Sequence, residues 1–186
     1  MNDGHDRRPA GGRAARRQWI LGATAALGSL ASRCASAAAT QEKISGTAET
    51  IHHVTVFNAE RMRVYDALTD TAQFDALTRL SAAGMRYGTK PTQIGTGDGS
   101  PFLLFGGYIS GRHIELIPGK RIVQAWRTAR WDPGAYSIVR FDLEEQGTST
   151  RLVFEQSAFP PGEAASLARG WKENYWEPLE KYLAGA

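Results

Sequence analysis

Few polar side chains in this chain are expected to face the protein interior, and Gln156 is the most informative of them. It follows Leu152 and Phe154 at alternate positions of an extended segment, so all three side chains point to one face of a strand. A buried amide must find hydrogen-bond partners, which either a bound ligand or the protein's own groups can supply. The sequence leaves both interpretations open and favours the second.

Arg112 is the other polar candidate. Simple alternation from Ile114 and Leu116 turns it inward, where a guanidinium could pair with a ligand carboxylate. Gly111, however, marks a place where a β-bulge could reset the alternation and turn Arg112 outward. Arg112 is therefore a candidate anchor whose direction depends on one backbone irregularity.

Aromatic residues are numerous, with five Trp and six Tyr. Such residues can line a pocket for a flat or apolar molecule, although each taken singly is equally compatible with an ordinary core. Trp126 is predicted to point inward, because its strand phase places Ile122 and Gln124 inside instead of Arg121 and Arg127. Trp131 is predicted on a loop at the rim. The predicted cavity residues are Phe105, Tyr108, Arg112, Trp126, Phe141, Phe154, Gln156, Trp171 and Tyr175.

No pattern in the chain indicates a metal site, a cofactor or a catalytic residue. His52 and His53 are neighbours on a strand and face opposite sides, His113 is isolated, and Cys34 is the single cysteine. The segment 95–101 is rich in glycine but has neither the Lys and Ser/Thr of a phosphate loop nor calcium-ligand spacing. A G-x-S-x-G nucleophile motif is also missing.

The elements that would position these residues follow from the spacing of apolar positions. The pattern predicts a strand over 49–58, two short helices over 59–70 and 71–80, and an antiparallel meander over 101–159. A long helix begins near Ala164, with Ala164, Ala168, Trp171, Tyr175, Leu179 and Tyr182 along one face. Pro178 is expected to kink this helix. The fold class is therefore α+β.

The first 37 residues resemble a twin-arginine export signal. Arg16 and Arg17 precede a mildly apolar run over 19–30, which is shorter than the roughly 20 residues of a membrane span. A small-residue cleavage site falls between Ala37 and Ala38, and residues 38–48 are expected to form a linker. We expect export through the twin-arginine translocase, a periplasmic or secreted mature protein, and no stable membrane span in it.

Removal of this leader changes the charge of the protein. The leader holds six Arg and two Asp, so subtracting its net +4 from the +3 of the whole chain leaves −1 for the remaining 149 residues. The basic footprint of a nucleic-acid-binding domain is therefore absent from the body of the chain. This length suffices for one domain over 49–186.

The order of a strand, two helices, an antiparallel meander and a long helix resembles the helix-grip fold of the START and polyketide-cyclase-like (SRPBCC) superfamily. Within it, the chain resembles the branch named after the activator of the 90-kDa heat-shock-protein ATPase. The residues carrying the resemblance are VYDALTDTAQFDALT (64–78), GGYISGRHIELIPGKRIVQAWR (106–127), VRFDLEEQGTSTRLVFEQSAFP (139–160) and Gly170-Trp171. The resemblance implies a curved antiparallel sheet wrapped around the C-terminal helix, with a cavity between them.

The resemblance says more about fold than about activity, because one fold hosts many functions. Many members of the family resemble one another in having a histidine where this chain has Gln156, which weakens any proposal of acid-base chemistry there. The first hypothesis is an exported, non-catalytic binding protein for a small hydrophobic molecule or lipid. The alternative is a cofactor-independent cyclase- or hydrolase-type enzyme that uses Arg112, Gln156 or Tyr108. The family name alone suggests a third possibility, a co-chaperone-like ATPase activator.

Overall fold

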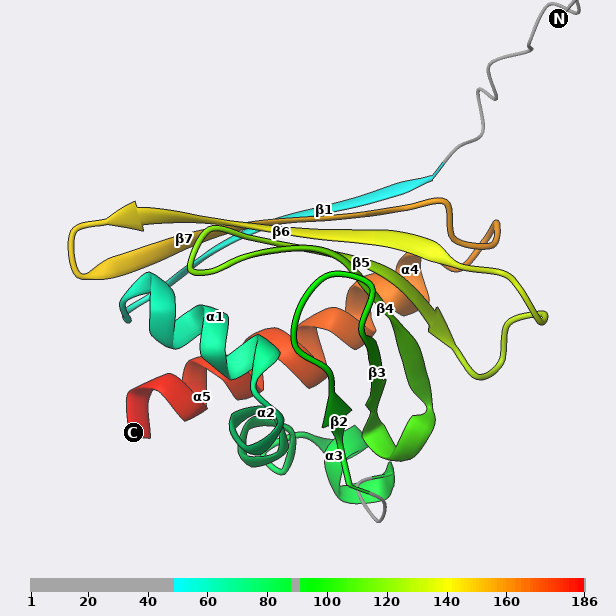
Figure 1. Ribbon diagram of the computed structural model, residues 1–186, viewed down its shortest axis with the longest axis horizontal. Coiled ribbons are helices and arrows are strands. Elements are labelled where there is room, and N and C mark those ends of the chain that lie inside the picture. Colours follow the sequence, from blue (N-terminus) through cyan, green and yellow to red (C-terminus); the bar gives the residue numbers. More distant parts are fainter. Residues whose placement is uncertain (1–48, 88–90, 186) are drawn as a thin grey trace, which may run out of the picture. The chain divides into compact units, whose positions relative to one another are not determined.

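The computed structural model of the chain describes residues 49–87 and 91–185 (Figure 1). The predictions for the export signal at Arg16 and Arg17, for cleavage between Ala37 and Ala38, and for the linker over 38–48 lie outside the described residues. Within the described part, no helix is long and apolar enough to cross a membrane.

The predicted antiparallel meander is confirmed as part of one seven-stranded sheet with the order β1-β7-β6-β5-β4-β3-β2. The first strand of the chain therefore pairs with the last one, and the meander continues from there to the far edge. The short strand β2 was not predicted. The strands are β1 (Thr50–Phe57), β2 (Gln93–Ile94), β3 (Pro101–Leu104), β4 (Ile109–Ile117), β5 (Arg121–Thr128), β6 (Ser137–Gln146) and β7 (Ser149–Ser157).

Two short helices follow β1, as predicted: α1 (Arg61–Thr69) and α2 (Thr71–Thr78). Asp70 separates them, and its carboxylate accepts a hydrogen bond from the backbone N–H of Gln73 at 2.9 Å, which caps α2. A third helix, α3 (Ala82–Tyr87), was not predicted. Its six residues carry too little apolar periodicity to distinguish it from a loop.

The C-terminal helix runs beneath the curved sheet, with α1, α2 and α3 beside it (Figure 1). It consists of α4 (Ala164–Trp171), a π turn η2 (Lys172–Trp176) and α5 (Glu177–Gly185). The predicted irregularity near Pro178 takes the form of this π turn, in which the Glu177 N–H bonds to the Lys172 carbonyl. Proline has no N–H to donate and crowds the preceding turn, so a wider turn just before it relieves the conflict.

The sheet and this helix enclose the hydrophobic core. Strand β6 alternates strictly, with Val139, Phe141 and Leu143 inside, and β7 places Leu152 and Phe154 opposite them. Their rings meet the helix: the centroids of Phe154 and Trp171 are 4.5 Å apart, and those of Phe141 and Trp171 are 5.8 Å apart. The predicted α+β helix-grip architecture is confirmed.

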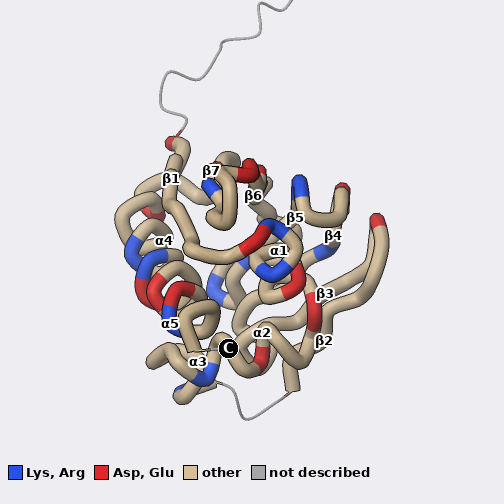
Figure 2. Tube along the Cα trace, turned by 90° about the vertical axis from the view of Figure 1, so that its left-hand side faces the viewer, with Lys and Arg blue, Asp and Glu red and all other residues tan. Residues whose placement is uncertain are grey.

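Residues of both charge signs lie along the strands of the sheet (Figure 2), and several of them pair across neighbouring strands. Arg121 donates to Asp142 across β5 and β6 at 2.7 Å, and Arg151 donates to Glu144 across β7 and β6 at 2.6 Å. Exposed ion pairs of this kind contribute at most about 1 kcal/mol each. The outer face of the sheet is therefore solvated, and the aromatic pocket described below lies on the inner side.

Candidate functional site

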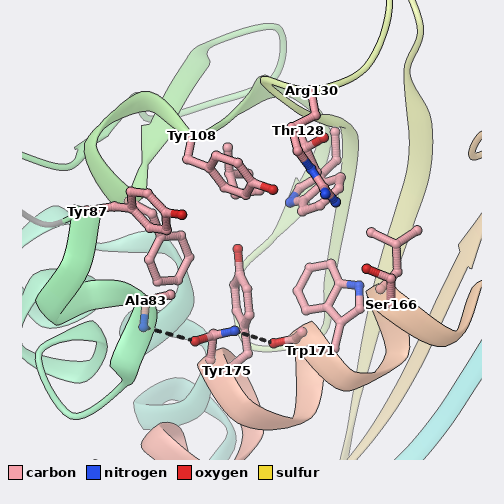
Figure 3. Close-up of a pocket in the computed structure, with 14 residues that line it drawn as sticks. Ala83, Tyr87, Tyr108, Thr128, Arg130, Ser166, Trp171 and Tyr175 are labelled. Atoms are coloured by element: carbon pink, nitrogen blue, oxygen red, sulfur yellow. Dashed lines mark hydrogen bonds between the residues drawn. The ribbon is translucent and has the colours of Figure 1, made fainter. Parts of the chain in front are cut away.

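A pocket of about 210 Å³ lies between the C-terminal helix and the β4–β5 end of the sheet (Figure 3). Helix α3 and the short 3-10 turn η1 (Phe105–Gly107) close one side of it. Arg130 is the single charged residue among those lining it. The lining residues are Ala83, Tyr87, Phe105, Tyr108, Ile109, Trp126, Thr128, Arg130, Ser166, Leu167, Gly170, Trp171, Asn174 and Tyr175.

The helix contributes its wall through ordinary helical spacing. Leu167, Trp171 and Tyr175 fall on successive turns and are buried. Gly170 lies on the same side, and a Cβ atom built on it would meet no other atom within 4 Å. The missing side chain of Gly170 therefore contributes open volume to the pocket.

A strained turn forms the opposite wall. Phe105 has a φ of 50°, a left-handed conformation that is unfavourable for an aromatic residue, and glycines with positive φ follow it. Its ring packs edge-on against Tyr175, with centroids 5.5 Å apart. Gly106 passes so close to Tyr87 that a Cβ on it would lie 2.1 Å from the Tyr87 carbonyl oxygen. This approach lets the rings of Tyr87 and Tyr108 stack at 5.2 Å beside the pocket.

Asn174 fastens α3 to the C-terminal helix at the edge of the pocket. Its side-chain oxygen accepts from the Ala83 N–H at 3.3 Å, and its amide nitrogen donates to the Gly170 carbonyl at 3.0 Å (Figure 3). Both ends of this amide are therefore occupied. At the rim, Arg130 lies 3.7 Å from Glu163, and its side chain is 61% exposed.

Three polar groups inside the pocket have no hydrogen-bond partner among the described residues. They are the Trp126 indole N–H, the Thr128 hydroxyl and the Tyr175 hydroxyl, on side chains that are at most 5% exposed. Burial raises the pKa of Tyr175, and the weaker influence of the adjacent Trp126 indole opposes that shift. The two groups are close, but they do not meet hydrogen-bond geometry. The phenol therefore keeps its proton and can donate it to a hydrogen bond.

Gln156 lies beneath the pocket and is fully engaged by the protein. Its side-chain oxygen accepts from the Trp171 indole N–H at 2.6 Å, and its nitrogen donates to the Ser137 hydroxyl at 2.9 Å. That hydroxyl in turn donates to the Trp126 carbonyl at 3.0 Å. The network ties the C-terminal helix to β5, β6 and β7 and leaves Gln156 free of the pocket.

The structure brings together five of the nine predicted cavity residues, namely Phe105, Tyr108, Trp126, Trp171 and Tyr175. Phe141, Phe154 and Gln156 are buried in the core behind them and do not line the pocket.

The prediction that Arg112 points into the cavity is wrong. The bulge lies between His113 and Glu115, so Arg112 faces solvent and donates to the Gly99 carbonyl at 3.0 Å, while His113 takes the inner position.

Trp131 lies on a loop as predicted, but it is only 7% exposed. Its ring packs against that of Trp126, with centroids 5.6 Å apart.

Some pocket residues were not predicted, although their spacing from predicted residues could have identified them. Thr128 follows Trp126 by two positions on the same face of β5, and Gly170 and Asn174 flank the aromatic residues of the helix. No local pattern pointed to Ala83 or Tyr87, because α3 itself was not predicted.

The three described histidines, His52, His53 and His113, do not line this pocket. His53 accepts a hydrogen bond at Nδ1 from the Trp176 indole at 3.0 Å, and its pKa is lowered, first by burial and then by the charge of His52. The pKa of His113 is lowered by burial against the opposing effect of Asp98. In the part of the chain that the structure describes, no three His, Cys, Asp or Glu side chains gather as metal ligands would.

A curved antiparallel sheet closed over a long helix, with an aromatic pocket between them, defines a helix-grip domain of the SRPBCC type. The family model described as "Activator of Hsp90 ATPase homolog 1-like protein" matches residues 58–184. The chain belongs to this family.

Several individual proteins are similar to the chain. Human "Activator of 90 kDa heat shock protein ATPase homolog 1" is 26% identical over 91 residues, which are 49% of this chain and 27% of that protein. The Dictyostelium discoideum homolog is 33% identical over 84 residues, which are 45% of this chain and 22% of that protein. The chain thus spans about a quarter of the length of these relatives.

Solved structures share the fold. An HSP90 activator from Plasmodium falciparum superposes with a TM-score of 0.64 at 21% identity, covering 73% of this chain and 96% of that one. CalU16 from Micromonospora echinospora superposes with a TM-score of 0.59 at 20% identity, covering 74% of this chain and 77% of that one.

Proposed function

We propose that the protein is an exported, non-catalytic binding protein that holds a small hydrophobic molecule in the pocket between the sheet and the C-terminal helix. The observation that carries the proposal is the combination of aromatic walls with buried polar groups that the protein itself leaves unpaired. Small-molecule sites are mostly apolar and contain a few convergent polar groups. A core built only for stability would pair these groups or replace them with apolar ones.

The size of the pocket limits the occupant. An apolar cavity of about 150 Å³ suffices to bind benzene. The pocket here has about 210 Å³, which suits one substituted ring or two fused rings better than a long lipid chain.

Of the three polar side chains assigned to the enzymatic alternative, Arg112 and Gln156 are not available to a ligand in the pocket. Arg112 faces solvent, and both ends of Gln156 are occupied inside the core. Tyr108 lines the pocket, but it has no acidic or basic side chain beside it among the lining residues except Arg130 at the rim.

Gly170 offers a direct test by filling the pocket. In a Gly170→Leu variant the side chain starts in open space, since a Cβ at this position meets no atom within 4 Å, so the fold should persist while the added side chain fills the pocket. We expect an apolar probe such as naphthalene, titrated by tryptophan fluorescence, to bind the wild type and to lose at least about tenfold in affinity in this variant, equivalent to about 1.4 kcal/mol.

Two glycine variants serve as controls. Gly170→Ala adds a single methyl and improves helix propensity, so it should bind within about threefold of the wild type and be slightly more stable. Gly185→Leu adds the same side chain at a helical glycine that also has open surroundings but lies outside the pocket, and it should bind normally. A wild-type protein that takes up no apolar probe, or a Gly170→Leu variant that binds as well as the wild type, would contradict the proposal.

A further inference from the structure

The chemistry of the unpaired groups specifies the ligand more closely than size does; this step rests on the proposed binding function. The indole N–H of Trp126 can only donate a hydrogen bond, whereas the hydroxyls of Thr128 and Tyr175 can donate or accept. All three groups are buried, line one pocket and lack partners among the described residues. The donor-only group sets the requirement: in the described residues no acceptor meets hydrogen-bond geometry with the Trp126 N–H, although the Tyr175 hydroxyl lies close to it, and an acceptor on the ligand would satisfy it.

Three features place the polar end of the site deep in the pocket. Trp126 and Thr128 are neighbours on the inner face of β5, two residues apart and therefore about 7 Å along the strand. The Tyr175 side chain points from the helix into the pocket (Figure 3), and its hydroxyl lies close to the Trp126 indole. The ring of Trp171 stands next to Tyr175, with centroids 4.2 Å apart, and so provides a flat wall beside the donors.

The charge of the site decides between a neutral and an anionic acceptor. Arg130 is the single cation among the lining residues, and it lies at the exposed rim near Glu163. A carboxylate at the deep donors would lose its hydration without gaining a buried cation, which is strongly unfavourable. A carbonyl oxygen accepts the same hydrogen bonds with a much smaller desolvation penalty.

We infer that the pocket selects a small planar aromatic molecule carrying a neutral carbonyl group, an aldehyde, ketone or quinone oxygen, which accepts hydrogen bonds from Trp126 and Tyr175 with Thr128 within reach. The aromatic walls hold the ring, and the donors fix its orientation. The carbonyl gives selectivity over a hydrocarbon of the same shape, because the hydrocarbon leaves the Trp126 donor unpaired.

The test compares acetophenone with α-methylstyrene, which has nearly the same shape but carries a CH₂ group in place of the oxygen. Titrations followed by two-dimensional NMR give both dissociation constants, and the Trp126 indole proton, assigned by its loss in Trp126→Phe, reports the hydrogen bond directly. We expect acetophenone to bind about tenfold tighter and to shift that proton downfield, whereas α-methylstyrene should not shift it downfield.

Isosteric variants make the test specific. Tyr175→Phe and Thr128→Val remove one hydroxyl each without changing the size of the side chain. Tyr175→Phe should lower acetophenone affinity by about threefold to tenfold, while α-methylstyrene affinity stays the same or rises. Tyr182→Phe removes a hydroxyl that contacts Gln73 outside the pocket, and it should change neither constant.

The outcomes separate this inference from the proposed function. If both probes bind equally and Tyr175→Phe changes nothing, the carbonyl inference is overturned while the binding function stands. If benzoate binds more tightly than acetophenone, the site prefers an anion and the inference is again wrong. If none of the probes binds, both the inference and the proposed function are wrong.

Discussion

Replacement of Gln156 by leucine tests whether this residue belongs to the protein's own framework or to a ligand site. The variant keeps approximately the same volume but removes the acceptor of the Trp171 indole N–H, a bond of 2.6 Å on a side chain that is 2% exposed. The Ser137 hydroxyl keeps its bond to the Trp126 carbonyl. One buried donor is therefore left unpaired, which costs about 1–3 kcal/mol.

We expect Gln156→Leu to lower the free energy of unfolding by about 2 kcal/mol in urea titrations followed by circular dichroism. The corresponding decrease in melting temperature is about 6–10 °C for a domain of this size. Affinity for an apolar probe should change by less than about threefold, because Gln156 does not line the pocket and the rings of Phe154 and Tyr175 still hold Trp171 in place. Gln146→Leu, at an exposed position near the end of β6, should change stability by no more than about 0.5 kcal/mol.

A double-mutant cycle with Trp171→Phe isolates the hydrogen bond. Either single change leaves one partner unpaired, whereas the double variant leaves neither, so the two effects should be less than additive by about 1–2 kcal/mol. A coupling energy near zero would refute the network. Loss of probe binding in Gln156→Leu without loss of stability would instead make Gln156 a ligand contact.

Three further predictions concern pH, backbone and export. Because the pKa of His53 is lowered from 6.5, the folded protein binds fewer protons than the unfolded chain below about pH 6.5, and its melting temperature should fall as the pH drops below that value. His53→Asn keeps an amide oxygen that can accept the Trp176 N–H, and it should weaken this pH dependence. An unchanged slope of melting temperature against pH in His53→Asn would contradict the prediction. Gly106→Ala should destabilise by about 1–3 kcal/mol, more than Gly134→Ala, which has positive φ but open surroundings; equal losses would show that the Tyr87 carbonyl is no obstacle. Replacing Arg16 and Arg17 by lysine should retain the protein inside the cell, and the exported wild type should begin at Ala38 by mass spectrometry; export of a chain that keeps residues 1–37 would argue against the signal.

The sequence predicted the fold well because the relevant patterns are local. Alternation over β6 and β7 identifies the inward face of each strand, and the spacing from Ala164 to Tyr182 identifies the face of the helix that packs on it. Two apolar surfaces of this kind must bury one another, so the packing of the helix on the sheet and the inward position of Trp126 and Trp171 followed from the pattern. The helix-grip arrangement itself was implied by the family resemblance.

The pocket was less accessible to sequence reasoning, because its details depend on distances between segments far apart in the chain. The bulge between His113 and Glu115 shifts the alternation by one residue relative to Leu116, which is why Arg112 lies outside and His113 inside. Gln156 could be placed in the interior by alternation, but its partners Trp171 and Ser137 come from other elements. Periodicity shows which way a side chain points; only the packing of sheet against helix determines what it meets and where the protein leaves donors unpaired.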